Sequence, residues 1–481
     1  MVKEIAWKWI DDHKDYLVSI SDRIWGYAEY GLCEVKSSNL IAGTLEENDF
    51  RVVRGVAGMP TAILAEKGKG KPIIATMGEY DALPGISNKP VPRKEPLIEG
   101  GMGHGCGHNI HGTTALGAAL AVSEAMEKSD IEGTIRFYGT PAEETAGGKR
   151  FMVNAGLFDD VDAALSHHPG TLNVATLSSS NVTSGARFHF YGKTSHAAAN
   201  PEAGRSALDA VELMNVGVNY LREHIIPSAR IHYVIESGGG QPNVVPDYAR
   251  SWYYIRAPEQ DLLEPIKKRV VKIAEGAALM TDTRLEYEMS KRGYHKIPNR
   301  ILSEIVTSNM RKVGSPSYSE EDYAFAAELA KSFPLEDRET SLRNNKVPNW
   351  QNYVDMDIVQ DIFDAWDDGE TSPGSTDVSD VSWITPTMEF RTACNVNGAP
   401  GHSWQFVACS GSSLGHKSLI FAAKTMAGSA LDLIQSPDLV KRARAEQLSR
   451  LRGRVYERDT SREPPLEKAR ELAEALKGKI G

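Results

Sequence analysis

Three apolar runs in the first 180 residues each end in polar side chains, and this repetition constrains the fold more than any other feature. A helical pattern at 113–128 follows the first run. Alternating strands and helices of this kind predict an α/β fold in which strands feed loops. Ligands collect beyond the carboxyl ends of strands in such sheets, so one polar site is expected there. The runs and the side chains that they deliver are 71–85 with Glu79 and Asp81, 133–144 with Glu143 and Glu144, and 160–170 with His167 and His168.

Residues 182–298 follow a different pattern. Predicted strands and helices occur there in the order β-α-β-β-α-β, which is that of a ferredoxin-like unit. Helical periodicity resumes at 299–314, so this unit is predicted to be inserted into the first domain. A chain of 481 residues is also too long for one ordinary core. We therefore expect an α/β domain made of residues 1–181 and 299–481, with an inserted α+β domain at 182–298.

Two segments carry no assigned role. Residues 315–375 are polar and acid-rich, and we expect helical pieces and loops that decorate the site or the surface. The chain after residue 437 is charged and predicted to be helical. Its basic stretch at 441–454 has helical spacing with acids nearby, which favours a solvated helix face over a binding patch.

Composition narrows the class of protein. The net charge of −10 gives nucleic-acid binding no general electrostatic support. No apolar run approaches the roughly 18–20 residues needed to span a bilayer, and the first residues lack the apolar core of a signal peptide. The four cysteines, Cys33, Cys106, Cys394 and Cys409, are too few and too widely spaced for a disulfide framework. We expect a cytoplasmic enzyme.

The stretch GHGCGHNIHG at 103–112 places three histidines and a cysteine in ten positions. Imidazole, carboxylate and thiolate are ligands of hydrolytic metal ions, which leave one position for water. Cys106 and His108 are close enough to serve one metal centre or to bridge two. A lone Cys-x-His is nevertheless more often structural than metal-binding, so the other strand ends have to supply further ligands.

The adjacent glutamates Glu143 and Glu144 are a second chemical candidate. Adjacent carboxylates repel each other unless one is coordinated and the other takes protons, so one can be a ligand and the other a general base. An isolated doublet is more commonly an exposed helix start, and His167 and His168 alone are equally well explained as loop histidines. These separate explanations do not account for the whole set on successive strand ends.

A serine-hydrolase interpretation competes with the metal site. GSSLG at 411–415 matches the nucleophile elbow G-x-S-x-G, whose fold needs its triad in the order Ser, acid, His. No histidine follows His416, which lies three residues after Ser413. The order of the residues therefore excludes this interpretation.

Eight motifs occur in a fixed order along the chain: GEYDALPG, GHGCGHN, GTPAEET, SHHPG, GKTSHAAANPEAGRSALDA, QPNVVPDYA, STDVSDVSW and GHSWQ. With them the sequence resembles the M20 metallopeptidases of the amidohydrolase branch, and within that branch it is similar to the aminobenzoyl-glutamate hydrolase B-subunit group. The resemblance extends over roughly residues 15–435. It implies a two-domain fold, an α/β catalytic domain with the inserted ferredoxin-like module as a dimerisation (lid) domain.

The resemblance also implies two divalent metal ions per subunit, with zinc, manganese and cobalt all suited to the mixed ligands. Cys106 takes the position of a thiolate that bridges the two ions. By the same comparison the terminal ligands are His108, Glu144, His168 and His402, and His167 competes for the place of its neighbour His168.

Further roles follow from the resemblance alone. Glu143 takes the position of the general base, and Asp81 that of an aspartate that orients a metal-binding histidine. In the inserted module, His196 matches a histidine that enters the partner subunit's active site. Asn243 and Arg256 match contacts to the amide oxygen and to the substrate carboxylate.

Two positions depart from the family pattern. Asn109 stands where the branch usually has aspartate after Cys-Gly-His, and Glu79 begins what is commonly Asp-x-Asp. Neither change removes a ligand, but both bear on metal preference. His104 and His111 are expected to be loop scaffolding.

The expected function is metal-dependent hydrolysis of an N-acyl amino acid, such as an aroyl or indolyl-acyl conjugate of glutamate or aspartate, of which p-aminobenzoyl-glutamate is one. Glu143 takes the proton of a water that bound cations acidify, and later gives it to the leaving amine, while His196 and Asn243 stabilise the oxyanion. A homodimer joined through 182–298 is expected, with no nucleic-acid or membrane partner. A dipeptidase or aminoacylase with the same metals, and a metal-stabilised binding protein without turnover, are the alternatives.

Overall fold

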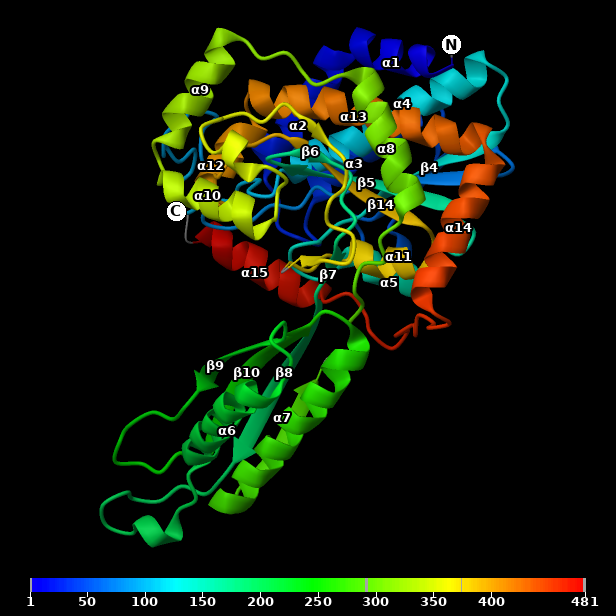
Figure 1. Cartoon of the computed structure of the whole chain (residues 1–481). Helices are drawn as coiled ribbons and strands as arrows, with labels where there is room; N and C mark the ends of the chain where they lie inside the picture. The colour runs from blue at the N-terminus through cyan, green and yellow to red at the C-terminus, as the bar shows by residue number, and fades with distance from the viewer. Residues whose placement is uncertain (1, 290–292, 373, 479–481) are drawn as a thin grey trace. The chain divides into compact units, whose positions relative to one another are not determined.

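The chain folds as two units in the computed structural model, which describes residues 2–289, 293–372 and 374–478 (Figure 1). Unit 1 comprises the described residues of Met1–Ser178, Ile297–Glu370 and Thr376–Gly481. Unit 2 comprises those of Ser179–Lys296 and Thr371–Ser375. In the part of the chain that the structure describes, every helix is too short or too polar to cross a membrane.

Unit 1 is built on an eight-stranded sheet. Four neighbouring strands in its middle, β4, β3, β5 and β14, run parallel to one another, so their carboxyl ends meet at one edge. Long parallel strands bury both faces, which explains their nearly continuous apolar sequences. The strand order is β1 (Arg51–Arg54), β2 (Ile63–Lys69), β4 (Gly133–Gly139), β3 (Ile73–Gly78), β5 (Ala163–Gly170), β14 (Thr387–Ala393), β6 (Asn173–Val174) and β12 (Ile362–Phe363).

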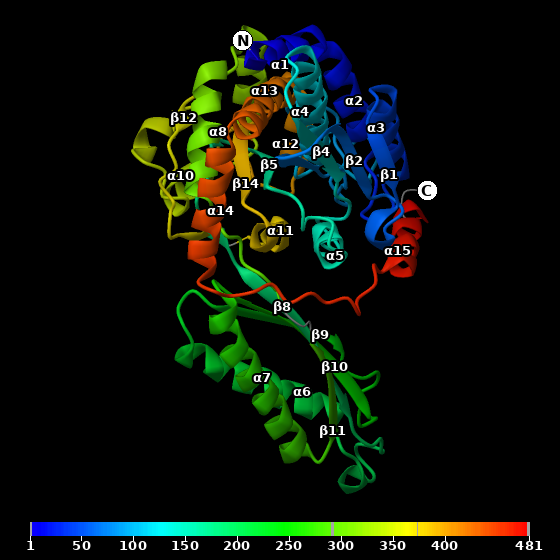
Figure 2. The same cartoon turned by 90° about the vertical axis from the view of Figure 1, so that its right-hand side faces the viewer.

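Helices cover both faces of this sheet (Figure 2). Side chains alternate along a strand, and in β3 Ile74 packs into one apolar cluster while Ala75 and Met77 pack into the other. The larger cluster includes residues of α1 (Val2–Asp12), α2 (Lys14–Tyr27), α3 (Val35–Glu47), α4 (His108–Lys128), α8 (Arg300–Val313), α13 (Ser413–Gln435) and α14 (Pro437–Leu451). The other includes residues of α5 (Gly148–Asn154), α11 (Val378–Ile384) and α15 (Leu466–Gly478).

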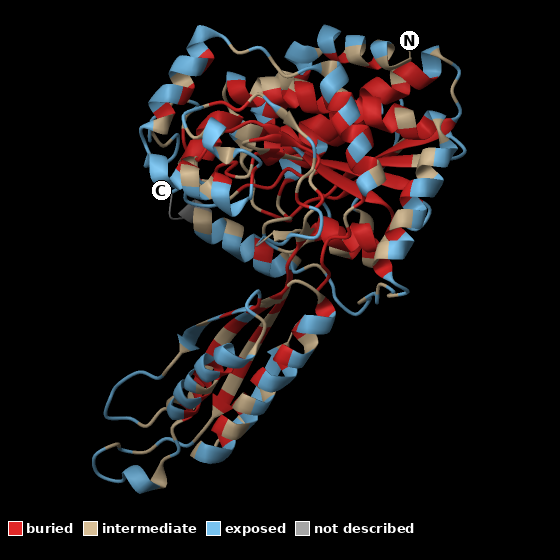
Figure 3. Ribbon diagram, viewed as in Figure 1, coloured by how far each residue is buried: buried red, intermediate tan, exposed pale blue. Residues whose placement is uncertain are grey.

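Helix α4 lies in the centre of unit 1, and almost all of its residues are buried (Figure 3). A helix that is small and apolar on all sides is suited to such a position. It begins at His108, five residues before the start predicted from the apolar pattern. The difference arises because polar side chains of its first turn hydrogen-bond within the fold: His108 Nδ1 donates to Asp81 Oδ1, and the Asn109 amide donates to Ser21 Oγ. Gly107 precedes it with φ +74, where a Cβ atom would lie 3.0 Å from Phe406 and Pro169.

Unit 2 contains the predicted β-α-β-β-α-β order and a four-stranded antiparallel sheet with strand order β11-β8-β10-β9. Its helices and strands enclose a separate apolar core. The α/β fold with an inserted ferredoxin-like unit is thus confirmed. The elements are β8 (Val182–Tyr191), α6 (Ala207–Leu221), β9 (Arg230–Ser237), β10 (Tyr248–Ala257), α7 (Gln260–Thr281) and β11 (Arg284–Met289), with the short pair β7 (Ser179–Ser180) and β13 (Thr371–Ser372).

The polar segment 315–375 forms helices and loops, most of them packed on unit 1. Apolar side chains from this segment join two small clusters beside the sheet edge and α12 (Trp404–Ser410). Its elements in unit 1 are α9 (Glu320–Ala330), α10 (Leu335–Asn344), the 3-10 turn η4 (Trp350–Tyr353) and strand β12. A further 3-10 turn of unit 1 is η1 (Val56–Gly58), and unit 2 has η2 (Pro201–Ala203) and η3 (Arg222–His224).

Candidate metal centre

The carboxyl ends of the parallel strands bring the expected ligands of unit 1 together. Strand β3 is followed by Asp81, β4 by the doublet Glu143–Glu144, and β5 carries His168 near its end. Cys106 and His108 lie at the start of α4, and the loop after β14 leads to His402. Strands adjacent in the sheet thus place residues distant in sequence at a single edge.

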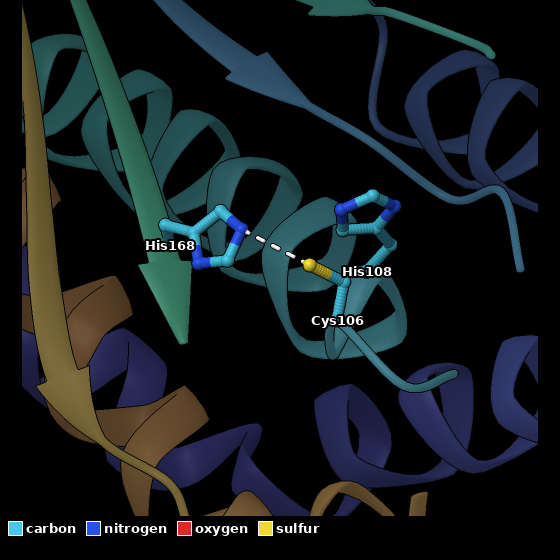
Figure 4. Close-up of side chains that lie close together, drawn as sticks. All are labelled: Cys106, His108 and His168. Atoms are coloured by element: carbon cyan, nitrogen blue, oxygen red, sulfur yellow. Dashed lines mark hydrogen bonds between the residues drawn. The ribbon is translucent and has the colours of Figure 1, made fainter. Parts of the chain in front are cut away.

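A first group of donor atoms consists of Cys106, His108 and His168, all within 4.8 Å of one another (Figure 4). Cys106 Sγ lies 3.4 Å from His168 Nε2. The rings of His108 and His168 are nearly perpendicular, with centroids 6.1 Å apart. The three side chains therefore face a common point from a strand and from the beginning of a helix.

A second group consists of Cys106, Glu144 and His402, again within 4.8 Å of one another. His402 Nε2 lies 3.5 Å from Cys106 Sγ and 3.2 Å from Glu144 Oε1. Cys106 belongs to both groups, so its sulfur lies where one thiolate can contact two metal ions.

The two groups fit divalent metal ions of the zinc type. Donor atoms on one tetrahedral zinc ion lie roughly 3.3–3.7 Å apart, given its bonds of about 2.0–2.3 Å to nitrogen, oxygen and sulfur. The distances from Cys106 to both histidines fall in this range. Two buried atoms that face the site, His108 Nε2 and Glu144 Oε1, each lie near one charged side chain of the same cluster, Glu79 Oε2 at 3.0 Å and His402 Nε2 at 3.2 Å. A metal ion would give both atoms a ligand bond in a buried setting where polar atoms need partners.

Hydrogen bonds on the far side of the imidazoles of His108 and His168 orient the ligand nitrogens. His108 Nδ1 lies 2.8 Å from Asp81 Oδ1 and donates to it, which leaves Nε2 for a metal ion. The other oxygen, Asp81 Oδ2, accepts the backbone N–H of Glu144 at 3.0 Å. His168 Nδ1 donates to the carbonyl oxygen of Pro169 at 2.8 Å. Asp81 therefore couples two expected ligands from different strands.

The adjacent histidines His167 and His168 point to opposite faces of β5, as strand geometry requires. His168 faces Cys106, whereas His167 Nε2 lies 2.7 Å from Thr392 Oγ1, away from the donor groups. Burial holds the pKa of His167 well below its usual range, so this side chain is neutral. Of the pair, only His168 contacts the site.

His104 and His111 are both buried outside the two donor groups. His104 Nε2 lies 3.1 Å from the carbonyl oxygen of Ile24, and burial lowers its pKa to about 3. His111 is in α4 rather than in a loop, and its Nδ1 accepts the backbone N–H of Glu79 at 3.0 Å. Burial lowers the pKa of His111 to about 3 as well. Both are neutral structural groups.

Charged neighbours shift the acidity of Cys106. Burial by itself raises the pKa of the thiol, but the positive field of His168 and hydrogen bonds from His108, His168 and His402 lower it to about 6. Hydrogen bonds to Cys106 and Glu144 raise the pKa of His402 to about 10. The thiol is therefore prepared as a thiolate, which is the form that binds metal.

Glu143 lies beside the ligands, in a group of close oxygen and nitrogen atoms with His108 and Glu144. Burial first, and then the carboxylates of Glu79 and Asp377, raise its pKa well above the usual range. Glu144 differs from Glu143, because hydrogen bonding to His402 lowers the pKa of Glu144 despite its burial. The two neighbouring glutamates therefore have pKa values shifted in opposite directions.

A buried ion network beneath the ligands was not predicted. The ammonium of Lys149, which is fully buried, pairs with Glu79 and lies 2.7 Å from Asp377 Oδ1. Glu79 Oε2 in turn lies 3.0 Å from His108 Nε2. Burial opposes ionisation of Glu79, but the positive charges of Lys149 and His108 hold its pKa well below the usual range. Only the tertiary fold reveals Lys149, since a lysine at a helix start is ordinarily solvated.

The remaining expected residues, His196, Asn243 and Arg256, all lie in unit 2. His196 is exposed, and its Nδ1 accepts the backbone N–H groups of Ala198 and Ala199 at 3.2 and 3.1 Å. Its Nε2 therefore carries the proton and is a hydrogen-bond donor. The Asn243 carbonyl oxygen accepts from Ala197 N at 3.0 Å, so the loops of His196 and Asn243 are joined.

Arg256 lies at the opposite end of the unit 2 sheet. In β10, Arg256 pairs with Thr183 at the start of β8, whereas Tyr248 pairs with Tyr191 at its end. The loops that carry His196 and Asn243 continue beyond that second end. Eight residues of extended strand separate the two ends by about 26 Å at roughly 3.3 Å per residue. Within one copy of unit 2, Arg256 is therefore remote from His196 and Asn243.

The sequence model of peptidase family M20/M25/M40 matches residues 75–406. The B component of the p-aminobenzoyl-glutamate hydrolase of Escherichia coli K12 is 40% identical, with 92% of this chain and 94% of that protein covered. The Xaa-Arg dipeptidase of the mouse, Mus musculus, is 29% identical over 93% of this chain and 92% of its own. These similarities extend over both units.

Solved structures support the same fold. The YXEP protein of Bacillus subtilis, described as a dinuclear metal binding peptidase from the M20 family, aligns with a TM-score of 0.58 and 18% sequence identity. The alignment covers 88% of this chain and 99% of that one. At this identity the likeness concerns the fold.

In metal-free protein, we expect Cys106 to be alkylated by iodoacetamide with a rate that rises through a midpoint at about pH 6, because its thiolate is the nucleophile. Divalent metal should suppress the reaction by occupying the sulfur. Mass spectrometry of proteolytic peptides would locate the label. Cys394 and Cys409 serve as internal controls, since burial raises the pKa of both. A midpoint at the pKa of an ordinary cysteine would contradict the conclusion that the three histidines lower the pKa of Cys106.

Replacing Lys149 by methionine should lower the free energy of unfolding by about 3–5 kcal/mol, because Glu79 and Asp377 would be left buried without their cation. Denaturant unfolding measures this change. Lys128→Met is the matched control: it removes an exposed pair with Glu124 in α4 and should leave stability essentially unchanged. Equal effects of the two substitutions would refute a special role for the buried network.

Proposed function

The chain belongs to peptidase family M20/M25/M40, and from this premise we propose that it is an amidohydrolase that depends on two divalent metal ions. Its substrate is an N-acyl amino acid, most closely an aroyl or indolyl-acyl conjugate of glutamate or aspartate such as p-aminobenzoyl-glutamate. The observation that carries the proposal is the sharing of Cys106 by two donor groups with Glu143 beside them. The name of the E. coli relative supports the substrate class.

Cys106, His108 and His168 would hold one ion, and Cys106, Glu144 and His402 the other. Zinc, manganese and cobalt all accept such mixed ligands. When bound, the ions acidify water and polarise the amide carbonyl. The chain's contribution is a fixed ligand set, in which Asp81 orients His108 and also holds the backbone of Glu144.

Glu143 is the proposed proton carrier. Its side chain lies next to the ligand atoms but belongs to neither Cys106-containing group. A carboxylate whose pKa is raised by burial accepts a proton from water more readily and can return it to the leaving amine. Glu144 cannot share this work, because its carboxylate is committed to the ligand group.

Residues of unit 2 complete the proposed site. The exposed Nε2–H of His196, together with Asn243, suits stabilisation of an oxyanion on the amide carbonyl. The guanidinium of Arg256 suits bidentate binding of the substrate's carboxylate. Since Arg256 and His196 lie at opposite ends of the sheet, one small substrate can meet both only if two copies of unit 2 contribute.

This constraint supports a homodimer joined through residues 182–298. Unit 2 exposes an apolar stripe on α6, where Leu213, Val216 and Tyr220 are 39%, 50% and 67% exposed at helical spacing. Strand β9 is an edge of its sheet and exposes Val234 and Ile235. An open strand edge beside an apolar stripe is suited to pairing with a second copy.

A dipeptidase is the second candidate, and the similarity to the mouse Xaa-Arg dipeptidase favours it. A panel of dipeptides, simple acyl amino acids and aroyl-glutamates separates these activities by kcat/KM. A metal-stabilised binding protein without turnover is the remaining alternative. It is excluded if any member of the panel is hydrolysed in a metal-dependent way.

Exhaustive chelation should abolish hydrolysis, and Glu143→Gln should lower kcat by about 10²–10⁴-fold in metal-loaded protein, because the proton carrier is lost while the ligands remain. Elemental analysis must show unchanged metal content in the variant. Full activity of protein proven to be metal-free would refute the proposed function. Full activity of Glu143→Gln would reassign the base.

Mixing inactive His196→Ala and Arg256→Met subunits should restore up to about half of wild-type activity per heterodimer, since one of two symmetric sites receives both intact residues. The matched control mixes His196→Ala with Asn243→Ala. These two residues lie at the same end of the sheet, so neither site becomes complete. Recovery in both mixtures, or in neither despite demonstrated subunit exchange, would reject the shared site.

A further inference from the structure

The polar segment 315–363 has no role in the chemistry described so far, yet it packs closely on unit 1. We refer to it as the insert. Leu342, Val347 and Val359 of the insert share an apolar cluster with Leu172 and Val174, just beyond the strand that carries His168. On another side, Ala326 and Leu329 of α9 share a cluster with residues that include Val396 and Ala408. The insert is thus anchored by two apolar contacts.

Arg338 in α10 is the polar centre of the insert. Its side chain is only 5% exposed, and its guanidinium donates to three partners. Nε donates to the carbonyl oxygen of Asn397 at 2.9 Å, and Nη1 to that of Val354 at 2.9 Å. Nη2 lies 2.7 Å from Asp357 Oδ1. A buried cation that bonds to two other chain segments, residues 354–357 and Asn397, fixes their positions relative to α10.

Arg338 binds the loop of residues 395–401, which follows β14, through its hydrogen bond to Asn397. Asn397 is held from both sides, because its backbone N–H donates to Asp357 O at 2.9 Å and its amide to Tyr353 O at 2.8 Å. The next residue, Gly398, has φ +86, and a Cβ there would lie 2.6 Å from the Cβ of Arg338. Only glycine permits this close approach of the loop to α10.

This loop delivers His402, the most exposed of the expected ligands, with 57% of its side chain accessible. His402 has φ +51, a left-handed backbone conformation that is uncommon for residues other than glycine. Its backbone N–H donates to Gly105 O at 3.1 Å. By contrast, His108 and His168 lie in α4 and β5, inside the core.

The two donor groups are therefore held by different means. Core elements fix the group of Cys106, His108 and His168, whereas the group of Cys106, Glu144 and His402 depends on a loop. We propose that Arg338 is a positioning residue that holds His402 in place through the loop 395–401, so that the insert governs binding of one of the two metal ions. This inference rests on the proposed two-metal function.

Arg338→Met keeps the length of the side chain and removes its donors. The variant should bind one ion with unchanged affinity and the other about 10–100-fold more weakly, as changes behind a ligand typically do. Dialysis against zinc buffered by a chelator over a range of free concentrations, followed by elemental analysis, measures both affinities. At intermediate free zinc the wild type should retain two ions per chain and the variant one.

Arg343→Met is the matched control. Arg343 lies in the same helix, but its side chain is exposed, and among the described residues it pairs with Glu339 and lies over the ring of Trp350, both within the insert. It should retain both ions with wild-type affinities. Thermal unfolding of the metal-free proteins provides a reference for stability. A general loss of stability would weaken the binding of both ions together, and that result would overturn the inference.

Asn397→Ala tests the same contact from the loop side and decides the matter if Arg338→Met does not fold. It removes the amide bonds to the carbonyl oxygens of Tyr353 and Met356 and leaves Arg338 intact. A lower affinity for one ion alone supports the inference, and unchanged affinities for both ions overturn it. If the wild type itself binds no metal, the proposed function fails; if the wild type binds two ions and the variants do too, only the role of Arg338 fails.

Discussion

The sulfur of Cys106 lies within 3.5 Å of two histidines that are separated by more than two hundred residues in the chain, and this convergence is the constraint on which the catalytic unit depends. It requires the strand that carries His168 and the strand that leads to His402 to be parallel neighbours. It also requires a helix to begin at His108, directly behind the cysteine. The central parallel strands and the buried helix α4 meet both requirements, because their apolar faces pack into a common core.

Collecting so many acidic groups in one place has an electrostatic cost, and the fold offsets it with charges that are absent from the ligand set. Lys149 is the clearest case, a buried ammonium between Glu79 and Asp377. Asp81 uses one oxygen for His108 and the other for the backbone of Glu144. Glu79, Asp377 and Asp81 thus have defined partners, and the doublet Glu143–Glu144 can hold two carboxyl groups whose pKa values are shifted in opposite directions.

The distance between Arg256 and His196 within unit 2 constrains how many copies of the chain the proposed site needs. The strand β10 is too long for a small substrate to contact Arg256 and His196 of one copy, so the proposed site draws on two. The fixed tautomer of His196 suits it to donate to an oxyanion rather than to accept a proton. The insert on unit 1 adds a further level of control, because its contacts end at the loop of His402.

The sequence by itself determined the classes of structure and chemistry. Periodicity of apolar residues predicted the α/β unit and the inserted β-α-β-β-α-β unit, and the strand ends delivered Asp81, Glu144 and His168 to one edge. These features are local or follow from the geometry of parallel sheets, so they can be inferred without coordinates. The ordered motifs added the family, which the match over residues 75–406 confirms.

Only the tertiary structure decided which histidine of the pair His167–His168 faces the site. His167 and His168 are equivalent in composition, and the direction of one strand face separates them. Nothing local marks Lys149 as buried or Arg338 as the link between an insert and a ligand loop, because their partners lie tens to hundreds of residues away. Burial and long-range contacts are properties of the packed chain, and they assign these residues their physical roles.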